Sequence, residues 1–530
     1  MKKVVLLAIN AKYVHSSLSV WVIADGIKKY ARLPYDVSVI EATIHQQGSD
    51  IADMVAASAP DVIGVSTYIW NAGMMPEILS LLRERLPDVV IVLGGPEASH
   101  NADFWLERGA DHVLPGEGEH TFPAFLDGCH GDSSINANGQ ENRPLDSLDN
   151  MDDYIDALDG RIAYLETSRG CPFQCAFCLS SGSGVRFFPI ETAKKWLQQL
   201  SKSNARTIKL VDRTFNCDAG RAYELFEYVI NLDTACCFHF EVAADLFDER
   251  TLELLSTAPP GRIQLEAGLQ SFFEPALKAA SRKTDLRKAE QNIRTLLRGQ
   301  NIHTHVDLIA GLPFEELHDF QDGFDRAYSL GAHTLQLGFL KLLHGSELRR
   351  QAESLGILFD EEAPYEIRSS KWLSPEDIQV LKHTENALQH TYNKSRFLST
   401  VEYVLSVSGL RPSYFYRELG KAAPNHGTYL EVYAVQVHDF CIRQPGVSKN
   451  ELHDRMVCDW LSMVKGKNMP DFMRNRDSRQ GKLLETAANR LGHKMRREEA
   501  TILSSGRGVF VDSENRDPVT GLYRVHQITK

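Results

Sequence analysis

Residues 166–178 read Glu-Thr-Ser-Arg-Gly-Cys-Pro-Phe-Gln-Cys-Ala-Phe-Cys and place Cys171, Cys175 and Cys178 within eight positions. This loop follows a candidate strand at 162–166 that opens a series of alternating strands and helices. Three thiolates in one tight loop can hold three irons of a cubane cluster, which leaves the fourth iron open to another ligand. A loop after a barrel strand lies at the catalytic mouth of the barrel. We therefore expect a [4Fe–4S] site at this loop.

A structural zinc site and chance clustering are the alternatives to an iron–sulfur cluster. Structural zinc is usually held by four ligands arranged as paired knuckles. No second knuckle follows the triplet, because Cys217, Cys236 and Cys237 are distant and have no histidine at ligand spacing. Nine cysteines, an odd count with three packed together, favour a metal site plus scattered thiols over a disulfide framework.

The composition is typical of a globular protein of several domains. The chain has 530 residues, 43% hydrophobic and 24% charged, and length alone suggests roughly three domains. The net charge of −12 argues against nonspecific binding of nucleic acid by the whole molecule. No apolar run reaches the roughly 18 residues that cross a bilayer, and residues 4–9 read as a buried strand rather than part of a signal peptide. We expect a cytoplasmic protein that does not contact membranes.

The first part of the chain alternates strand and helix. Candidate strands lie at 4–9, 37–40, 62–66 and 89–93, with helices at 18–30 and 75–85. Strands separated by helix-length segments predict crossovers and a parallel sheet, here a Rossmann-like doubly wound domain over residues 1–127. Residues 128–160, poor in apolar side chains near their start, are interpreted as a linker.

A second alternating region over residues 161–345 predicts a partial (β/α)6 barrel. Its candidate strands lie at 162–166, 207–211, 237–242, 263–269, 303–309 and 334–340, and its clearest helices at 192–200, 221–230 and 286–298. Residues 346–530 are predicted to be mostly helical. They end in a hairpin with arms at 509–511 and 523–525 and a turn near 517–518.

The cysteine spacing, with an aromatic residue just before the last cysteine, resembles the radical S-adenosylmethionine (SAM) superfamily. The resemblance implies that SAM chelates the open iron and is cleaved by one electron to a 5′-deoxyadenosyl radical. It also implies that Phe177 lies against the adenine of SAM. Further residues matching the SAM pocket follow in order along the barrel, namely Asp212, Glu241, Glu266, Gln270, Gly311 and Pro313. Taken singly, a strand-end acid is more often solvated or salt-bridged.

The front of the chain resembles the cobalamin-binding domain that precedes many radical SAM barrels. The matching positions after strands are Ser66, Thr67, Gly94, Gly95, Pro96, Gly116 and Glu117. Glycines there allow close approach of backbone to a bulky ligand. The Asp-x-His-x-x-Gly signature of a histidine-ligated cobalt is absent, and His15 and His100 lie in other surroundings, so we expect no histidine on the lower face of cobalt. The alternative is a Rossmann-like domain that has lost its cofactor.

The arrangement resembles cobalamin-dependent radical SAM proteins, the group that includes anaerobic Mg-protoporphyrin ester cyclase-like proteins, over about the first 345 residues. The resemblance implies methylation of an unactivated carbon and reduction by a flavodoxin or ferredoxin. A radical cyclisation or rearrangement without methyl transfer is the first alternative. A methylthiotransferase is disfavoured, because it needs a second cysteine triplet ahead of the barrel, where only Cys129 occurs.

The C-terminal region, which resembles an uncharacterised extension, discloses no substrate. Residues 465–497 are locally basic and could contact RNA phosphates or an anionic small molecule, although a solvated helical face is the commoner explanation. A regulatory or RNA-binding iron–sulfur protein is therefore the alternative from another functional class. The substrate itself, the oligomeric state and the role of the extension are not predicted.

Overall fold

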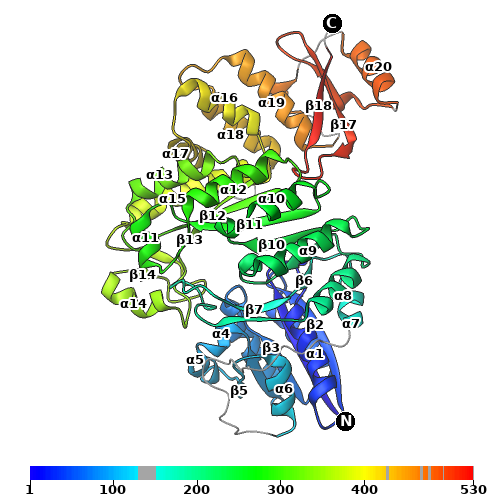
Figure 1. The fold of residues 1–530 in the computed structure, drawn as a ribbon, viewed down its shortest axis with the longest axis vertical. Coiled ribbons are helices and arrows are strands. Elements are labelled where there is room, and N and C mark those ends of the chain that lie inside the picture. The colour runs from blue at the N-terminus through cyan, green and yellow to red at the C-terminus, as the bar shows by residue number, and fades with distance from the viewer. Residues whose placement is uncertain (129–150, 425–428, 466–468, 475–478, 493, 529–530) are drawn as a thin grey trace.

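The computed structural model describes residues 1–128, 151–424, 429–465, 469–474, 479–492 and 494–528. Figure 1 shows an N-terminal domain at one end, a barrel in the middle and the last helices and strands at the other end. No helix among the described residues is long and apolar enough to cross a membrane. Most of the predicted linker, together with Cys129, lies outside the described residues.

The N-terminal domain is a five-stranded parallel sheet in the order β2-β1-β3-β4-β5. One face packs against α1 and α6 and the other against α2 and α3, with separate apolar clusters on the two faces. The elements are β1 (Lys2–Asn10), α1 (Leu18–Tyr30), β2 (Tyr35–Thr43), α2 (Gly48–Ala57), β3 (Val62–Ser66), α3 (Met75–Arg85), β4 (Val90–Gly94), α4 (Pro96–Ser99), α5 (Ala102–Leu106), β5 (His112–Val113) and α6 (Gly118–Leu126). The strand order reverses between β1 and β3, and ligands of doubly wound sheets bind at the carboxyl edge beside such a reversal.

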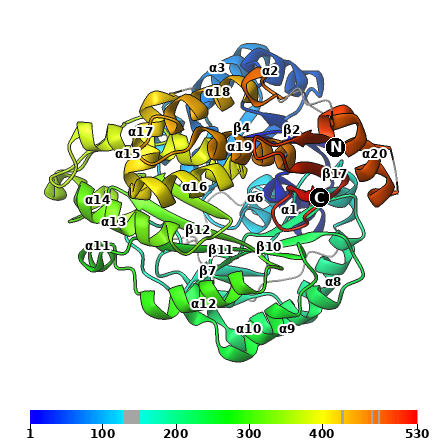
Figure 2. The same ribbon diagram turned by 90° about the horizontal axis from the view of Figure 1, so that it is seen from above.

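The middle of the chain forms a six-stranded parallel sheet in the order β13-β12-β11-β10-β9-β6. Figure 2 shows α8, α9, α10 and α12 along its outer face. The strands are β6 (Ala163–Leu165), β9 (Thr207–Leu210), β10 (Cys237–Val242), β11 (Ile263–Gln270), β12 (His303–Ala310) and β13 (Thr334–Phe339). The helices are α8 (Ile190–Ser201), α9 (Ala219–Asn231), α10 (Glu249–Ser256), α11 (Glu274–Ala279), α12 (Leu286–Arg298) and α13 (Leu317–Tyr328).

Side chains alternate along these barrel strands. In β11 and β12 the apolar residues Leu265, Ala267 and Val306 are buried beneath the helices, whereas Glu266 and His305 are partly exposed on the opposite face. A parallel sheet in an α/β domain is normally covered on both faces, and its strands then read as apolar runs. Here one face is polar, which marks the concave side of an open barrel as a site rather than a core.

The C-terminal region is mostly helical and ends in a small antiparallel sheet, β16-β17-β18. Its elements are α14 (Glu347–Leu355), β14 (Leu358–Phe359), β15 (Ile367–Ser369), α15 (Pro375–His390), α16 (Leu398–Ser408), α17 (Pro412–Ala422), α18 (Leu430–Cys441), α19 (Lys449–Met463), α20 (Gln480–Leu491), β16 (Ala500–Ile502), β17 (Gly508–Arg516) and β18 (Tyr523–Ile528). The predicted hairpin is confirmed as β17 and β18. The helix α7 (Asp152–Asp156) lies within the segment interpreted as linker, and the domain boundaries themselves stay predictions.

Candidate functional site: a cysteine loop facing a nucleotide-type sheet edge

The three cysteines occupy the loop after β6, as predicted. Cys171 ends β7 (Ser168–Cys171), which pairs with β8 (Gly184–Phe187) in a hairpin. Gly170 has φ +88°, and a Cβ there would lie 1.9 Å from the carbonyl oxygen of Gly184. Only glycine combines that conformation with that close approach. Further along, the N–H of Ala176 donates to the carbonyl of Ala280 at 2.8 Å, which anchors the loop to the barrel.

The thiols of this loop fit an iron–sulfur cluster better than a single ion. All three are free, Cys171 and Cys175 are buried, and burial raises the pKa of Cys178, with the sulfurs of the other two adding to the effect. Two groups of acidic and imidazole side chains in the described chain bring their ligand atoms within 4.8 Å of one another, but the cysteine triplet is not one of them. The three sulfur atoms are therefore spaced more widely than ligands of one metal ion. Such a spacing suits sulfurs that each bind a different iron of a cubane.

Donor groups already aim at two of the sulfurs. The Nη1 of Arg282 lies 3.7 Å from the sulfur of Cys175, and the hydroxyl of Thr214 lies 3.6 Å from that of Cys171. Hydrogen bonds to cluster sulfurs tune the reduction potential of such clusters. Sequence reasoning missed Arg282 because it is 107 positions from Cys175 and carries no motif of its own.

Asp212 holds the backbone that leads into the cysteine loop. Its buried carboxylate accepts hydrogen bonds from the N–H of Thr167 at 3.0 Å, the hydroxyl of Thr167 at 2.7 Å and the hydroxyl of Ser168 at 2.5 Å. Burial raises its pKa, against these hydrogen bonds. The structure thus gives Asp212 a positioning role, and a contact with SAM stays a prediction.

Glu241 and Glu266 lie side by side on the polar face of β10 and β11, in register with each other. The Nζ of Lys209 reaches both, at 3.3 Å and 3.2 Å, and the Nε2 of His239 lies 2.8 Å from Glu266. Burial raises the pKa of Glu241. For Glu266 the hydrogen bond from His239 and the charges of Lys209 and His305 outweigh burial and lower the pKa to about 2. Two acids with opposite shifts are a common arrangement in catalytic sites.

The end of β11 and the turn after β12 lie at the mouth of the barrel. Gln270 has φ +71°, and its buried side-chain carbonyl has no hydrogen-bond partner among the described residues. Gly311 has φ +98°, and a Cβ there would lie 2.8 Å from Ile367 of the C-terminal region. Pro313 follows in the same turn. Strain at Gln270 and an unsatisfied amide are features that accompany ligand sites.

The carboxyl edge of the N-terminal sheet contains a cradle of the kind that the sequence predicted for cobalamin. Gly95, with φ +93°, lies so close to Thr67 that a Cβ would be 2.6 Å from its carbonyl oxygen. The hydroxyl of Thr67 is fully buried and has no partner among the described residues. Ser66, Gly94 and Pro96 complete the two loops. A tight glycine approach and an unsatisfied buried hydroxyl fit a ligand with amide and phosphate groups.

Arg169 joins the two halves of the site. Its guanidinium lies 3.1 Å from Glu117 and 2.5 Å from Glu119 of the N-terminal domain, and 2.7 Å from Glu166 beside the cysteine loop. Glu117 is also paired with Arg186 of β8, and Gly116, with φ +89°, precedes it. Glu117, predicted as a cobalamin contact, therefore ties the cradle to the cysteine loop, and direct contact with cobalamin stays a prediction.

Phe177, His15 and His100 each lie against other protein groups. Phe177 packs against the barrel core and is partly exposed, as a side chain facing a ligand can be. The Nδ1 of His15 is 2.7 Å from the hydroxyl of Tyr164, and His100 lies against Gly345. Both histidines thus have protein neighbours, and the expectation of no histidine on cobalt stays a prediction.

Comparison with known proteins agrees with this geometry. Residues 4–126 match the B12 binding domain, residues 165–327 the radical SAM superfamily, and residues 353–502 a protein family of unknown function, DUF4080. A 2-(S-pantetheinyl)-carbapenam-3-carboxylate methyltransferase of Streptantibioticus cattleyicolor is 26% identical over 318 residues, 52% of this chain and 46% of that protein. The anaerobic magnesium-protoporphyrin IX monomethyl ester cyclase of Rubrivivax gelatinosus is 23% identical over 55% of this chain and 58% of its own length.

Among solved structures, the cobalamin-dependent SAM radical enzyme OxsB with aqua-cobalamin and SAM bound has a similar fold. The TM-score is 0.58 at 16% identity, covering 86% of this chain and 78% of that one. The chain spans about half the length of the curated relatives it matches. Residues 165–327, which include the cysteine loop, thus form a radical SAM superfamily domain. More narrowly, this chain carries a B12-binding domain in front of the radical SAM domain and a DUF4080 region behind it.

The predicted fold class is confirmed in its three parts, and so is the resemblance to cobalamin-dependent radical SAM proteins. The domains present are those that bind a [4Fe–4S] cluster with SAM and cobalamin, which confirms the predicted set of cofactors. The C-terminal region, which resembles an uncharacterised extension, contains the DUF4080 match at residues 353–502.

Proposed function

We propose that this protein is a cobalamin-dependent radical SAM methyltransferase that methylates an unactivated carbon. The observation that supports it most is the cluster of ion pairs around Arg169, which brings the cysteine loop against the carboxyl edge of the B12-binding domain. When bound, the cluster with SAM supplies a hydrogen-abstracting radical and cobalamin supplies a methyl group. Both groups act on one substrate only if their sites face each other, as these two edges do.

The chain's own residues then position and insulate the reactants. Asp212 fixes the entry to the cysteine loop through Thr167 and Ser168. Lys209 neutralises the two acids on the concave face of the barrel. We propose that Phe177, Glu241, Glu266 and Gln270 contact SAM, with Gly311 and Pro313 in the turn beside its adenine. A preorganised polar wall of this kind needs little rearrangement when a charged ligand binds.

Two other functions stay open as lesser candidates. The cyclase among the relatives favours a radical cyclisation or rearrangement that does not use cobalamin as a methyl donor. A regulatory, RNA-binding iron–sulfur protein is the candidate from another class, and the basic residues of α20 are its support. A flavodoxin or ferredoxin is the proposed electron donor. The relatives act on dissimilar molecules by their names, among them a carbapenam carboxylate and a hopanoid, so no substrate is carried over.

The decisive experiment is anaerobic reconstitution with iron, sulfide and cobalamin, followed by an assay for 5′-deoxyadenosine after addition of dithionite and SAM. We expect bound cobalamin in the absorption spectrum and 5′-deoxyadenosine that is lost in Cys175→Ala. Cys458→Ala is the matched control, because Cys458 lies on α19, away from the cysteine loop. Cleavage of SAM without bound cobalamin would contradict methyl transfer. A protein that binds cluster and RNA but never cleaves SAM would favour the regulatory function.

A further inference from the structure

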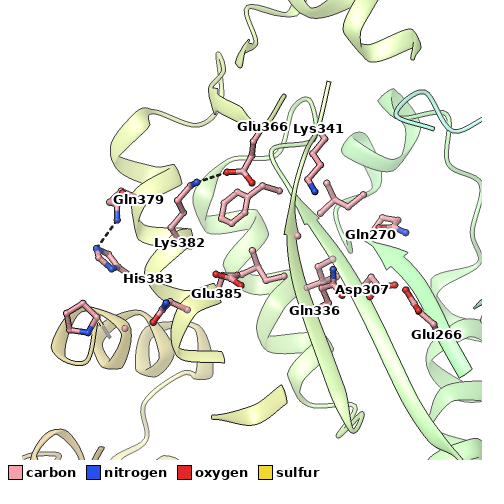
Figure 3. Close-up of a pocket in the computed structure, with 18 residues that line it drawn as sticks. Glu266, Gln270, Asp307, Gln336, Lys341, Glu366, Gln379, Lys382, His383 and Glu385 are labelled. Carbon is pink, nitrogen blue, oxygen red and sulfur yellow. Dashed lines mark hydrogen bonds and ion pairs between the residues drawn. The ribbon is translucent and has the colours of Figure 1, made fainter. Parts of the chain in front are cut away.

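A cavity of about 680 Å³ lies between the barrel and the DUF4080 region. Figure 3 shows Glu266, Gln270 and Asp307 on the barrel side and Gln379, Lys382, His383 and Glu385 of α15 on the other. Its far wall is completed by Gly420 of α17, which packs so tightly on α15 that a Cβ would lie 1.9 Å from the carbonyl of His383. The volume is in the usual range for small-molecule sites.

The edge strand of the barrel, β13, runs along this cavity. On its inner side the N–H of Leu340 donates to Ala310 of β12 at 2.9 Å. On its outer side the side-chain amide of Asn393 accepts from the N–H of Leu335 at 3.0 Å and donates to its carbonyl at 2.9 Å. Because this amide both accepts and donates, it takes the place of one peptide group of a neighbouring strand. Asn393 therefore covers the outer edge of β13 near Leu335, at the start of the strand.

The upper end of the same edge is covered by the C-terminal region. The N–H of Ile367 donates to the carbonyl of Leu340 at 2.9 Å, and the N–H of Leu342 donates to Tyr365 at 2.9 Å. Between these contacts and Asn393 lie Leu337 and Phe339, whose main-chain groups face outward because alternate residues of a strand bond to opposite sides. No hydrogen bond among the described residues reaches those outward groups. Both residues line the cavity.

This opening in the edge has the dimensions of a short peptide segment. Two residues of strand span roughly 7 Å, and unpaired strand edges accept an added strand through main-chain hydrogen bonds. Asn393 and residues 365–367 hydrogen-bond to the outer edge of β13 on either side of this opening. A ligand with one secondary amide and one carbonyl at peptide spacing would fill the gap between them with main-chain hydrogen bonds.

The charges at the cavity mouth favour an anionic group on that ligand. Lys382 is paired with Glu366 at 2.5 Å and lies over the ring of Phe339. Lys341, directly after β13, has no ion pair among the described residues, and Figure 3 shows its ammonium group pointing into the cavity. Of the acids that line the cavity, Glu266 and Asp307 are at the other end, inside the barrel, and Glu385 is on α15. Glu366, opposite Lys341, is already paired with Lys382. An anion would therefore bind at the Lys341 end.

We infer that this cavity is the substrate site and that the substrate is a peptide-like molecule, with a secondary amide hydrogen-bonded to the edge of β13 and a carboxylate at Lys341. The inference rests on the proposed function, since it names the substrate class of that site. The DUF4080 region then determines which substrate is accepted, because α15, α17 and the segment around Ile367 form the outer wall.

The test measures binding to the reconstituted 530-residue protein without turnover. The probe is N-acetyl-alanyl-glutamate, and its partner probe is the ester analogue in which the Ala–Glu amide N–H is replaced by oxygen. We expect the amide probe to slow hydrogen exchange at residues 334–342. We expect roughly fivefold weaker binding of the ester, and roughly tenfold weaker binding of the amide probe to Lys341→Gln. Lys288→Gln, an exposed change on α12, is the matched control and should not alter binding.

Equal affinity for the amide and ester probes, no protection at 334–342, or no binding of either probe would overturn the inference. Those results would leave the proposed function intact if the same preparation produces 5′-deoxyadenosine. If the probes bind with the expected pattern but the preparation never cleaves SAM, the inferred peptide site is supported and the proposed radical SAM reaction is contradicted.

Discussion

Two carboxyl groups of the barrel have pKa values shifted in opposite directions, and each shift has an identifiable physical cause. Glu266 is held ionised by His239 and Lys209, whereas Glu315 is held protonated. The carboxyl group of Glu315 is buried, and among the described residues its one hydrogen bond comes from the hydroxyl of Ser271, which donates to it. Burial raises the pKa of Glu315 to about 8. The residue follows the turn of Gly311 and Pro313, so its charge state bears on the mouth of the barrel.

Glu315→Gln is predicted to remove a pH dependence of stability. The folded protein keeps a proton on Glu315 up to a pKa of about 8, whereas the unfolded chain loses it near the ordinary value of 4.5. Between these values the folded state binds more protons, so the free energy of unfolding falls as pH rises, by a few kcal/mol in all. The neutral amide lacks this loss. We therefore expect the variant to be more stable than the parent at pH 9 and similar at pH 5.

Thermal unfolding at pH 5, 7 and 9 checks this prediction. Glu253→Gln, an exposed change on α10, is the control and should follow the parent at each pH. A parent protein whose Tm relative to Glu315→Gln does not fall between pH 5 and pH 9 would mean that the carboxyl group is ionised in the folded state.

Among helices and strands, those with strong local signals were predictable from the sequence. α1 and α12 match their predicted ranges, and α12 begins where the side chain of Asp285 accepts from the N–H of Lys288. The hairpin of β7 and β8 was not predicted, because it depends on Gly170 fitting against a carbonyl 14 positions away. The cysteines could be predicted because their spacing is a local signal. The partners of Arg169 and the role of Asn393 could not, because they too depend on residues far apart in the chain.

Packing of α17 on α15 leads to a prediction for Gly420. In most helices a change of glycine to alanine stabilises by roughly 1 kcal/mol. At Gly420 a Cβ would lie 1.9 Å from the main chain of His383, so the helices must separate. We expect Gly420→Ala to destabilise by about 1–3 kcal/mol. Gly481→Ala on α20, where a Cβ meets nothing within 4 Å, should be neutral or stabilising. Urea denaturation of both variants checks the contrast, and equal stabilities would show that α15 and α17 can move apart freely.

At the scale of the whole molecule, a few buried charges hold the B12-binding domain to the barrel. Arg169 is the centre of one such contact, and its side chain and those of Glu117 and Glu119 are each less than a fifth exposed. A further contact of the N-terminal domain, the hydrogen bond from Tyr365 to Glu97, joins the DUF4080 region to the helix that follows the predicted cobalamin cradle. Sequence alone could not reveal either contact, since each pairs residues that are far apart in the chain.

Arg169→Met is predicted to weaken the attachment of the N-terminal domain. Removing one partner of a buried ion pair leaves uncompensated charge and costs roughly 3–5 kcal/mol. We expect a lower denaturation midpoint and loss of cobalamin during gel filtration, with iron content reduced less. Arg368→Met is the control, because Arg368 is 70% exposed and lies 3.6 Å from Asp360. Retention of cobalamin by the Arg169 variant at parental levels would show that the cradle does not depend on this contact.

The pairing of Glu97 with Tyr365 also has a consequence in time. The two residues are 268 positions apart, and a ribosome adding roughly 5 to 20 residues per second needs roughly 13 to 54 s to cover that distance. For that interval the nascent N-terminal domain has the Glu97 carboxyl group without its tyrosine, and burial in the finished protein raises the pKa of that group. Tyr365 is therefore synthesised well after the loops of Thr67 and Gly95, and the order of synthesis separates the formation of the cradle from its contact with the DUF4080 region.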